Sequence, residues 1–244
     1  SLADAYSQIA EGAARLHWRS GGDLYAPLVL RVPCATQMRN ADWHSIGPEA
    51  GLAHVPGLKV VMPSTPYDAK GLMKAAIRDN NPVVLLEPRY LYHRLREELP
   101  EDDYIVPIGT AEVRRTGDHL TIITFGAMVY LALDAADLLE ADGISVEVVD
   151  LRTLAPIDLD LLSDSIQHTR KAMIVHADTL TGGFGAEIAA TLAEHCYTML
   201  DGPVMRVAAP DVPPPQSFAL ETAYLPDVAT ICDAARKLAT HAGK

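Results

Sequence analysis

The first candidate for chemistry is a histidine in a segment that has no clear helical or strand pattern. Trp43 and His44 are adjacent, and Glu49 follows them, within RVPCATQMRNADWHSIGPEAGLAHVPG (31–57). Imidazole titrates near neutral pH and often serves in general acid–base catalysis. The indole can form a wall, and a turn at Gly47–Pro48 can bring the carboxylate back towards the ring. The residues alone leave two interpretations open, a proton-transfer site or an ordinary surface histidine.

The second candidate is the glycine-rich segment TGGFGAEIAA (181–190), which is typical of a turn that enters a helix. Helix N-termini bind anions because free N–H groups and the helix dipole point outward. The glycine spacing differs from the dinucleotide pattern G-x-G-x-x-G, and Glu187 places a carboxylate in the first helical turn. The segment therefore favours a structural turn over a phosphate site. His54, and His176 near Asp178, are weaker candidates for chemistry.

The third candidate is AIRDNN (76–81), at the end of an expected helix. Carbonyl groups freed at a helix C-terminus, together with the Asp79 carboxylate, can make an oxygen-rich cation site. A plain helix stop before Pro82 is the alternative. The chain has no G-x-x-x-x-G-K loop, nucleophile elbow, zinc motif or GDG-type metal–diphosphate motif. By its motifs, it carries no complete catalytic apparatus.

The hydrophobic pattern of the first hundred residues indicates the scaffold for these groups. Apolar runs of strand length occupy 26–33, 58–64 and 82–88, which fits parallel strands buried on both faces. Between the last two runs, Thr65 can cap a helix that has Pro66 at its first position. The sequence therefore predicts a β–α–β unit.

The second half of the chain repeats the alternation. Strands are expected at 120–127, 145–152, 171–178 and 204–211, and helices at 129–143, 158–169, 185–200 and 227–243. Such alternation gives a mostly parallel sheet wrapped by helices. We expect three parts, namely a first domain at 1–100, a linker at 101–115 and a second domain at 116–244.

Composition limits the classes of function. The chain has 244 residues, 49% of them hydrophobic, which is enough for a substantial core. Its formal net charge of −12 would repel a phosphate backbone, so nucleic-acid binding is not expected. No apolar run reaches the ~20 residues that span a bilayer, and no signal peptide is visible. The three cysteines fit neither a disulfide framework nor a zinc spacing, which indicates a reducing cytosol.

Several strings together resemble one family, the β subunits of the E1 components of 2-oxo acid dehydrogenases (the pyruvate, acetoin and branched-chain enzymes). The strings are HVPGLKVVMPSTPYDAKGLMKAAIRDNNPVVLLEP (54–88), VVDLRTLAPID (148–158), GGFGAEIAA (182–190), AYLPDV (223–228) and YSQIAEGAARLHWRSGG (6–22). They occur in order and need few gaps, so the match extends from about residue 5 to the C-terminus.

The resemblance implies an α/β fold, with part of a thiamine pyrimidine-binding-type parallel-sheet domain followed by a transketolase C-terminal-type α/β domain. It implies thiamine diphosphate as cofactor, shared with an E1 α subunit that holds Mg²⁺ and the diphosphate. The implied assembly is an α2β2 heterotetramer whose β subunit can dock on a lipoyl acyltransferase, E2. A bacterial, cytoplasmic location follows from the same resemblance.

The resemblance also assigns site residues. His44 matches the family histidine that would assist proton transfer as the acyl group passes to lipoamide. The family's potassium site, built largely from main-chain carbonyls, carries over to Leu28, Ala76, Ile77, Asp79 and Asn81. This favours the cation site over the plain helix stop in AIRDNN.

The chain departs from the family at three places. The catalytic glutamate would lie upstream of Ser1, and the aromatic residue that packs on the pyrimidine would fall at about Ser1. We therefore assign no cofactor-binding residue to this chain, and expect a fragment or a companion polypeptide, with a sheet edge left open. CATQMRNAD (34–42) replaces the family's glycines, which predicts a different loop path. Ala177 replaces a glutamate that commonly follows the histidine.

The favoured function is the β component of a thiamine-diphosphate-dependent 2-oxo acid dehydrogenase E1, which decarboxylates a 2-oxo acid and acylates a lipoyl group. The altered loop motivates one alternative, a split transketolase-like or acyloin-forming carboligase subunit. The absent glutamate and aromatic motivate another, a non-catalytic paralogue or structural partner.

Overall fold

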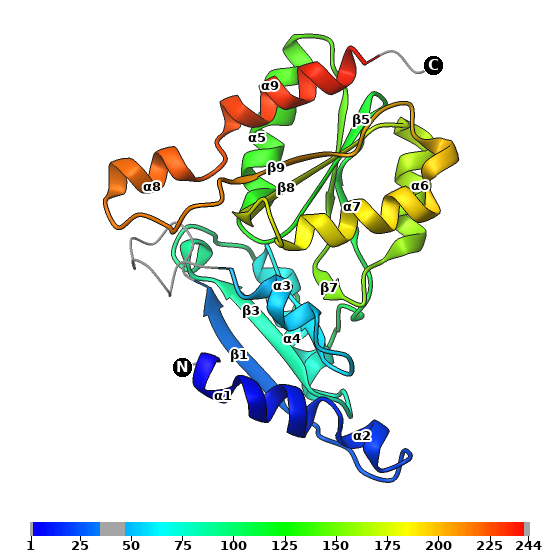
Figure 1. Ribbon diagram of the computed structural model, residues 1–244, viewed down its shortest axis with the longest axis vertical. Coiled ribbons are helices and arrows are strands. Elements are labelled where there is room, and N and C mark those ends of the chain that lie inside the picture. The colour runs from blue at the N-terminus through cyan, green and yellow to red at the C-terminus, as the bar shows by residue number, and fades with distance from the viewer. Residues whose placement is uncertain (1, 35–46, 242–244) are drawn as a thin grey trace.

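The computed structural model describes residues 2–34 and 47–241, which form two β-sheets with helices on their faces (Figure 1). The first part of the chain contains α1 (Leu2–Ser7), η1 (Gln8–Ala13), α2 (Leu16–Arg19), β1 (Val29–Cys34), α3 (Glu49–Ala53), β2 (Lys59–Val61), α4 (Pro66–Ile77), β3 (Val83–Pro88) and η3 (Arg89–Leu91). The second part contains β4 (Glu112–Arg115), β5 (Leu120–Thr124), α5 (Met128–Ala141), β6 (Val146–Asp150), β7 (Thr153–Ala155), α6 (Leu159–Thr169), β8 (Ala172–Thr179), α7 (Phe184–His195), η4 (Tyr197–Met199), β9 (Met205–Ala209), α8 (Phe218–Tyr224) and α9 (Val228–Ala239).

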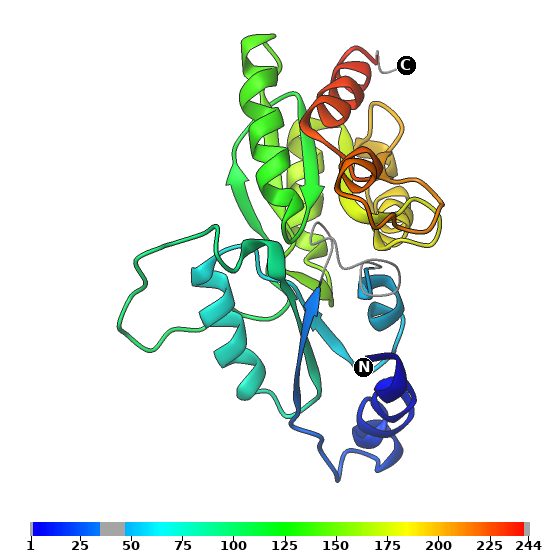
Figure 2. The same ribbon diagram turned by 90° about the vertical axis from the view of Figure 1, so that its left-hand side faces the viewer.

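Sheet A has the strand order β1-β3-β2-β7. The first three strands run parallel, whereas β7, which comes from the second part of the chain, pairs antiparallel with β2. Side chains alternate between the two faces of β3. Val83 and Leu85 pack with α4, and Val84 and Leu86 pack on the side of η1 and α3. Figure 2 shows α4 on one side of this sheet and the N-terminal helices on the other. β1 lies at the outer end of the strand order.

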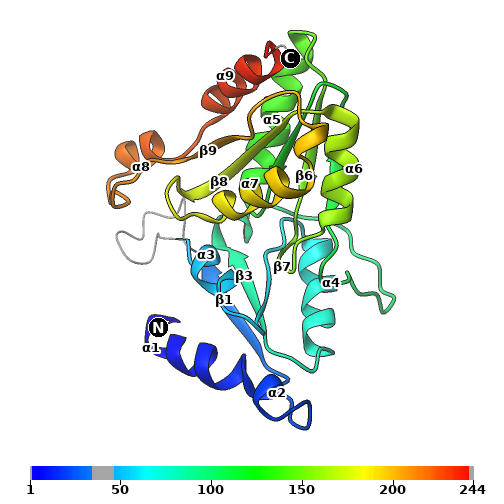
Figure 3. The same ribbon diagram turned by 45° about the vertical axis from the view of Figure 1, so that its right-hand side comes forward.

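Sheet B has the order β4-β6-β5-β8-β9, in which only β4 is antiparallel to its neighbour. Helices α5 and α9 pack on one face and α6 and α7 on the other, as Figure 3 shows. The strands β5, β6 and β8 are buried along most of their length, which explains their continuous apolar runs.

One hydrophobic cluster joins the two sheets. It contains Val60 and Leu86 from sheet A together with Ile123 and Val149 from sheet B, and all four side chains are buried. The same cluster includes Leu52 of α3, Ile166 of α6 and Ile188 of α7, so it holds the two parts of the chain together.

The sequence pattern predicts most of the longer elements and misses the short helices α3 and α8 and the short strands β4 and β7. The expected β–α–β unit is present. The Thr65 hydroxyl oxygen accepts a hydrogen bond from the Asp68 N–H at 3.0 Å, and Pro66 begins α4. Gly143 follows α5 with φ 76°, which confirms its predicted place at the helix end. The antiparallel strands β4 and β7 are not predicted, because three or four residues carry too little periodicity. Within the described residues, no helix is long and apolar enough to span a membrane.

Candidate functional site

The candidate site lies where the parallel strands of sheet A end. In open α/β sheets, ligands bind beyond the carboxyl ends of the strands. Here β1 ends at the buried Cys34 and β3 at Glu87 and Pro88, while Ser64 follows β2. The predicted catalyst His44 lies in 35–46, outside the described residues, so its role stays a prediction.

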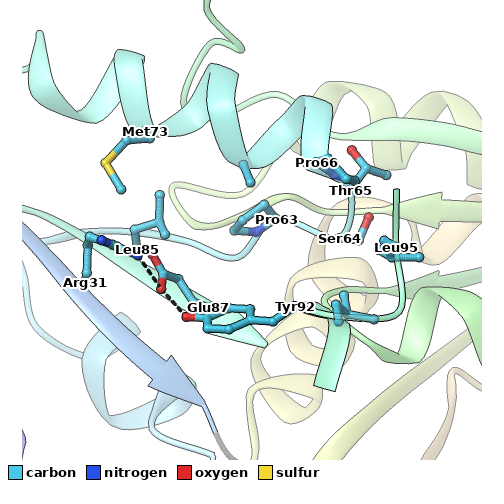
Figure 4. Close-up of a pocket in the computed structure, with 12 residues that line it drawn as sticks. Arg31, Pro63, Ser64, Thr65, Pro66, Met73, Leu85, Glu87, Tyr92 and Leu95 are labelled. Carbon is cyan, nitrogen blue, oxygen red and sulfur yellow. Dashed lines mark hydrogen bonds and ion pairs between the residues drawn. The ribbon is translucent and has the colours of Figure 1, made fainter. Parts of the chain in front are cut away.

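A pocket of about 360 Å³ opens between sheet A and α4 (Figure 4). Its lining residues are Arg31, Pro63, Ser64, Thr65, Pro66, Ala69, Met73, Leu85, Glu87, Leu91, Tyr92 and Leu95. The wall is mostly apolar. Arg31, Glu87 and Tyr92 lie together on one side, and Ser64 and Thr65 lie apart from them. Such a lining suits a small apolar group that carries a hydrogen-bonding end.

Three polar side chains of this pocket, those of Arg31, Glu87 and Tyr92, are hydrogen-bonded to one another. Glu87 accepts hydrogen bonds from Arg31 Nε at 2.5 Å and Nη2 at 3.0 Å, and also from the Tyr92 hydroxyl. Burial opposes ionisation of Glu87, but the bonds from Arg31 and Tyr92 outweigh it and hold the pKa of this carboxyl below its usual value. Burial and the bond to Glu87 raise the pKa of Tyr92 to about 12. Since its guanidinium is already paired, Arg31 is not a free anion-binding group.

A second group of polar side chains is buried between α3 and β8. Glu49 is 3% exposed, Asp178 8% and His176 0%. Neither Glu49 Oε2 nor either ring nitrogen of His176 has a hydrogen-bond partner among the described residues. Asp178 accepts the N–H of Thr179 at 2.8 Å.

The surroundings of these three groups favour their uncharged forms. Burial, followed by the Asp178 carboxylate, raises the pKa of Glu49, and burial also raises the pKa of Asp178. Burial, followed by the Arg206 guanidinium, lowers the pKa of His176 to about 4. Buried groups with such shifts often lie at functional sites. Local sequence did not predict this set, because Glu49 and Asp178 are far apart in the chain and influence each other only in the folded protein.

The glycine-rich segment passes over His176. Gly183 is the N-cap of α7, and a Cβ at Gly183 would lie 2.7 Å from His176 Cε1, while one at Gly185 would lie 2.4 Å from Nε2. Glycine is therefore needed here for close approach to the imidazole. A cleft of about 720 Å³ between α3 and α7 is lined by Gly182, Gly183 and Glu187 among others. The segment thus shapes a cleft, with a carboxylate in its first helical turn.

The predicted potassium ligands lie before β1 and between the end of α4 and β3, at the opposite end of sheet A. The Leu28 carbonyl accepts the Val83 N–H at 2.9 Å, and the Ala76 carbonyl accepts the Asp79 N–H at 3.2 Å. The Asp79 carboxylate accepts the Asn81 N–H at 2.9 Å and also pairs with the Lys59 ammonium. The turn after α4 thus lies next to the start of β2, and Leu28 lies next to the start of β3. Whether a cation binds here stays a prediction.

An ionic network across the junction holds α4 to sheet B. Asp68 is fully buried on α4 and forms an ion pair with Arg114 of β4. It also forms an ion pair with Arg152, at 3.1 Å. Arg152 has φ 56°, and its N–H donates to Asp150 at 3.2 Å. Its side chain also reaches the Ala111 carbonyl at 2.9 Å. This network fixes the first turn of α4, which borders the pocket of Figure 4.

Two family models match the chain in order. The first is "Transketolase, pyrimidine binding domain", over residues 5–94, and the second is "Transketolase, C-terminal domain", over residues 109–231. Together with the two sheets, they define a transketolase-type α/β protein.

Similarity to known proteins identifies the family within this class of transketolase-type proteins. The chain is 44% identical over 236 residues to the 2-oxoisovalerate dehydrogenase subunit beta of Bacillus subtilis (strain 168), covering 96% of this chain and 72% of that protein. It is 45% identical over 225 residues to the pyruvate dehydrogenase E1 component subunit beta of the same strain, covering 92% and 69%. The chain belongs to the family of E1 β subunits of 2-oxo acid dehydrogenases, as its motifs indicate.

A solved structure shows a similar fold at lower identity. It is described as "Split gene transketolase, inactive beta4 tetramer", and it superposes with a TM-score of 0.70 at 25% identity. The match covers 96% of this chain and 74% of the other.

Proposed function

We propose that the chain is the β component of a thiamine-diphosphate-dependent 2-oxo acid dehydrogenase E1 that acts with a separate α subunit. The observation that carries this proposal is the similarity, at 44% identity over 236 residues and 96% of the chain, to a 2-oxoisovalerate dehydrogenase subunit beta. In the proposed reaction a 2-oxo acid is decarboxylated and the acyl group passes to a lipoyl group, so an E2 partner is part of the proposal.

The described residues do not fit the diphosphate end of the cofactor. A diphosphate needs cationic groups or free N–H donors, and usually Mg²⁺. The first pocket offers a guanidinium already paired with Glu87, and the cleft beside α7 offers the Glu187 carboxylate. No group of three possible metal ligands of the His, Cys, Asp or Glu type occurs in the described part of the chain. The proposal therefore assigns diphosphate and Mg²⁺ to the α subunit.

When bound, thiamine supplies the carbon nucleophile and the electron sink for decarboxylation. The part proposed for this chain is to complete the site. His44 would move a proton during acyl transfer, and the rigid pocket beside α4 would support the sheet edge from which the loop with His44 departs. K⁺ at the turn after α4 would stabilise the same sheet from its other end.

Isothermal titration calorimetry tests the proposal directly. Thiamine diphosphate with Mg²⁺ is titrated into the chain alone, the α subunit alone and the co-purified complex. We expect saturable binding and decarboxylation of a 2-oxo acid only with the complex. A stable complex that neither binds the cofactor nor decarboxylates pyruvate or 2-oxoisovalerate would contradict the proposal.

The fold similarity to a split-gene transketolase supports a second candidate, a carboligase subunit. Such an enzyme joins the activated aldehyde to a second carbonyl compound and needs no lipoyl group. An assay of the complex with a 2-oxo acid and an aldehyde, without lipoyl protein, separates the two functions. Formation of an acyloin at a rate above that of lipoyl acylation would favour the carboligase.

A further inference from the structure

The segment directly after β3 carries arginines that have no acidic partner in the described structure. This arginine segment, RYLYHRLR (89–96), follows Pro88, the last residue of β3. Most arginines elsewhere in the described residues pair with carboxylates, as Arg236 does with Asp142. No described carboxylate forms an ion pair with the three exposed arginines of the segment, which are Arg89, Arg94 and Arg96. On a chain of formal net charge −12, such a group of unpaired cations is an exception.

Two leucines hold the arginine segment in place and leave its other side chains facing outward. Leu91 and Leu95 both line the pocket beside α4, and Figure 4 shows Leu95 at its edge. The Leu95 N–H donates to the Leu91 carbonyl at 3.3 Å, so this stretch forms a helical turn. Residues four apart share one face of such a turn. On another face, the Arg94 guanidinium accordingly lies over the Tyr90 ring, 4.0 Å from its centre.

The acidic residues that follow the arginine segment form no ion pair with it in the described structure. Glu97 instead accepts the N–H of Tyr67, in the first turn of α4, at 3.0 Å. Asp103 pairs with Lys74 and Arg78 of the same helix. These two carboxylates thus hold the following loop to α4, and the arginines stay available to another molecule.

The shape of the surface at the arginine segment favours a protein partner over a small ligand. Neither of the two cavities described above is lined by Arg89, Arg94 or Arg96. Small ligands bind in concave pockets, whereas arginine and tyrosine side chains on an exposed face are typical of protein interfaces. A guanidinium pairs with a carboxylate through two parallel hydrogen bonds. The arginine segment therefore fits a protein surface that presents aspartate or glutamate.

We propose that the arginine segment docks an acidic surface of the α subunit. The inference rests on the proposed function, in which the α subunit brings the diphosphate and Mg²⁺ to the carboxyl ends of sheet A. Cys34, the last residue of β1, lies opposite Pro88 in the register of β1 and β3. The arginine segment therefore leaves the sheet beside the start of the segment that contains His44. A subunit that completes the site at this edge meets the arginine segment as well.

The charge of the segment gives the docking a direction. Because the chain has a formal net charge of −12, most of its surface repels an acidic partner. The arginine segment is attractive to the same partner. Complementary charges of this kind speed association and fix the relative orientation of two proteins. The segment would thus direct the α subunit to the carboxyl ends of sheet A.

Biolayer interferometry tests the docking, with the full chain immobilised and the α subunit, thiamine diphosphate and Mg²⁺ in solution. Wild type, Arg94→Glu and Arg96→Glu are compared at about 50 mM and about 300 mM NaCl. At the lower salt concentration we expect the dissociation constant to rise at least about tenfold in each variant, mainly through slower association. The difference should shrink at the higher salt concentration, because salt screens exposed charges.

Lys237→Glu is the matched control. Lys237 is exposed on α9, and its reversal changes the net charge of the chain by the same amount. This variant should bind the α subunit as wild type does. The thermal midpoint of Arg96→Glu alone should equal that of wild type, which separates loss of binding from loss of fold. Equal dissociation constants in wild type, Arg94→Glu and Arg96→Glu would overturn the proposal.

The outcomes separate this inference from the proposed function. A complex that binds the cofactor and decarboxylates a 2-oxo acid, but is unaffected by both reversals, contradicts only the docking. Absence of a complex with wild type contradicts both. If the α subunit is insoluble alone, dissociation of the co-purified complex on dilution, followed by mass photometry, should show the same order of variants.

Inorganic diphosphate distinguishes a protein-docking surface from a site for small anions. It is added to the chain alone, and the thermal midpoint is measured for wild type and Arg94→Glu. We expect no difference between the two responses. A midpoint raised in wild type but not in Arg94→Glu would show a small-anion site and overturn the proposal.

Discussion

At the scale of single residues, Gly183 is restricted by its neighbours on both sides. A Cβ there would lie 2.3 Å from the Thr179 carbonyl oxygen and 2.7 Å from the His176 ring. Because backbone and a buried ring must both move, Gly183→Ala should lower the free energy of unfolding by about 1–3 kcal/mol. Urea unfolding measures this. The control Gly51→Ala, on α3 with open space around its Cβ, should be neutral or slightly stabilising, and equal losses in both variants would contradict the steric argument.

His44 is the residue-scale test of the proposed chemistry. In the complex with the α subunit, His44→Ala should slow acylation of lipoamide by roughly 10²–10⁴-fold, because a positioned general acid–base group contributes about that much. Decarboxylation, followed with an artificial electron acceptor, should fall much less. The control is His54→Ala, an exposed histidine at the cleft beside α7. Equal loss of both steps in His44→Ala would count against a role in acyl transfer.

At the scale of elements, the first turn of α4 depends on charges from sheet B. Asp68→Asn would leave Arg114 and Arg152, whose side chains are 18% and 11% exposed, without their shared carboxylate. Removal of one partner of a buried ion pair lowers the free energy of unfolding by about 3–5 kcal/mol. Glu112 and Asp150 also pair with these arginines, so we expect a loss at the lower end of this range. Arg236→Gln, at a half-exposed pair with Asp142, should cost less than about 1 kcal/mol. Similar costs for both variants would show that the network adds little.

The turn after α4 carries the cation prediction. If K⁺ binds only the folded chain, exchange of choline chloride for KCl at equal ionic strength should raise the thermal midpoint by about 3 °C or more. The Lys59 ammonium lies against the Asp79 carboxylate and repels a cation. Lys59→Met should therefore enlarge the response to K⁺. Identical midpoints in the two salts, in wild type and in this variant, would rule out the site.

At the scale of the whole molecule, the shared core predicts joint unfolding. Val60 and Leu86 of sheet A belong to the same buried cluster as Ile123 and Val149 of sheet B, and β7 pairs with β2. We therefore expect one cooperative transition, with equal calorimetric and van't Hoff enthalpies. Differential scanning calorimetry gives both enthalpies, and circular dichroism reports on the helices of both parts. Two separate transitions would show that the sheets unfold independently.

Most of the longer elements and the family can be read from the sequence. Continuous apolar runs predict β1, β2, β3, β5, β6, β8 and β9. The pattern is strongest for strands buried on both faces, such as β3 and β5, whereas the edge strands β1 and β9 are only partly buried. Thr65 and Pro66 predict the start of α4 for an equally local reason. The family followed from ordered motifs, and the relatives confirm it.

Which distant residues these elements bring together depends on the tertiary structure. Glu87 is bonded to Arg31 and Asp68 pairs with Arg152, and no local periodicity records contacts between such distant residues. The short strand β7 pairs with β2 of sheet A. This pairing was not predictable from local sequence, because β2 lies in the other part of the chain. A carboxyl group also owes its pKa to burial and neighbours, which exist only after folding. The contacts that shape the candidate site are therefore a property of the fold, whereas the residues that make them are visible in the sequence.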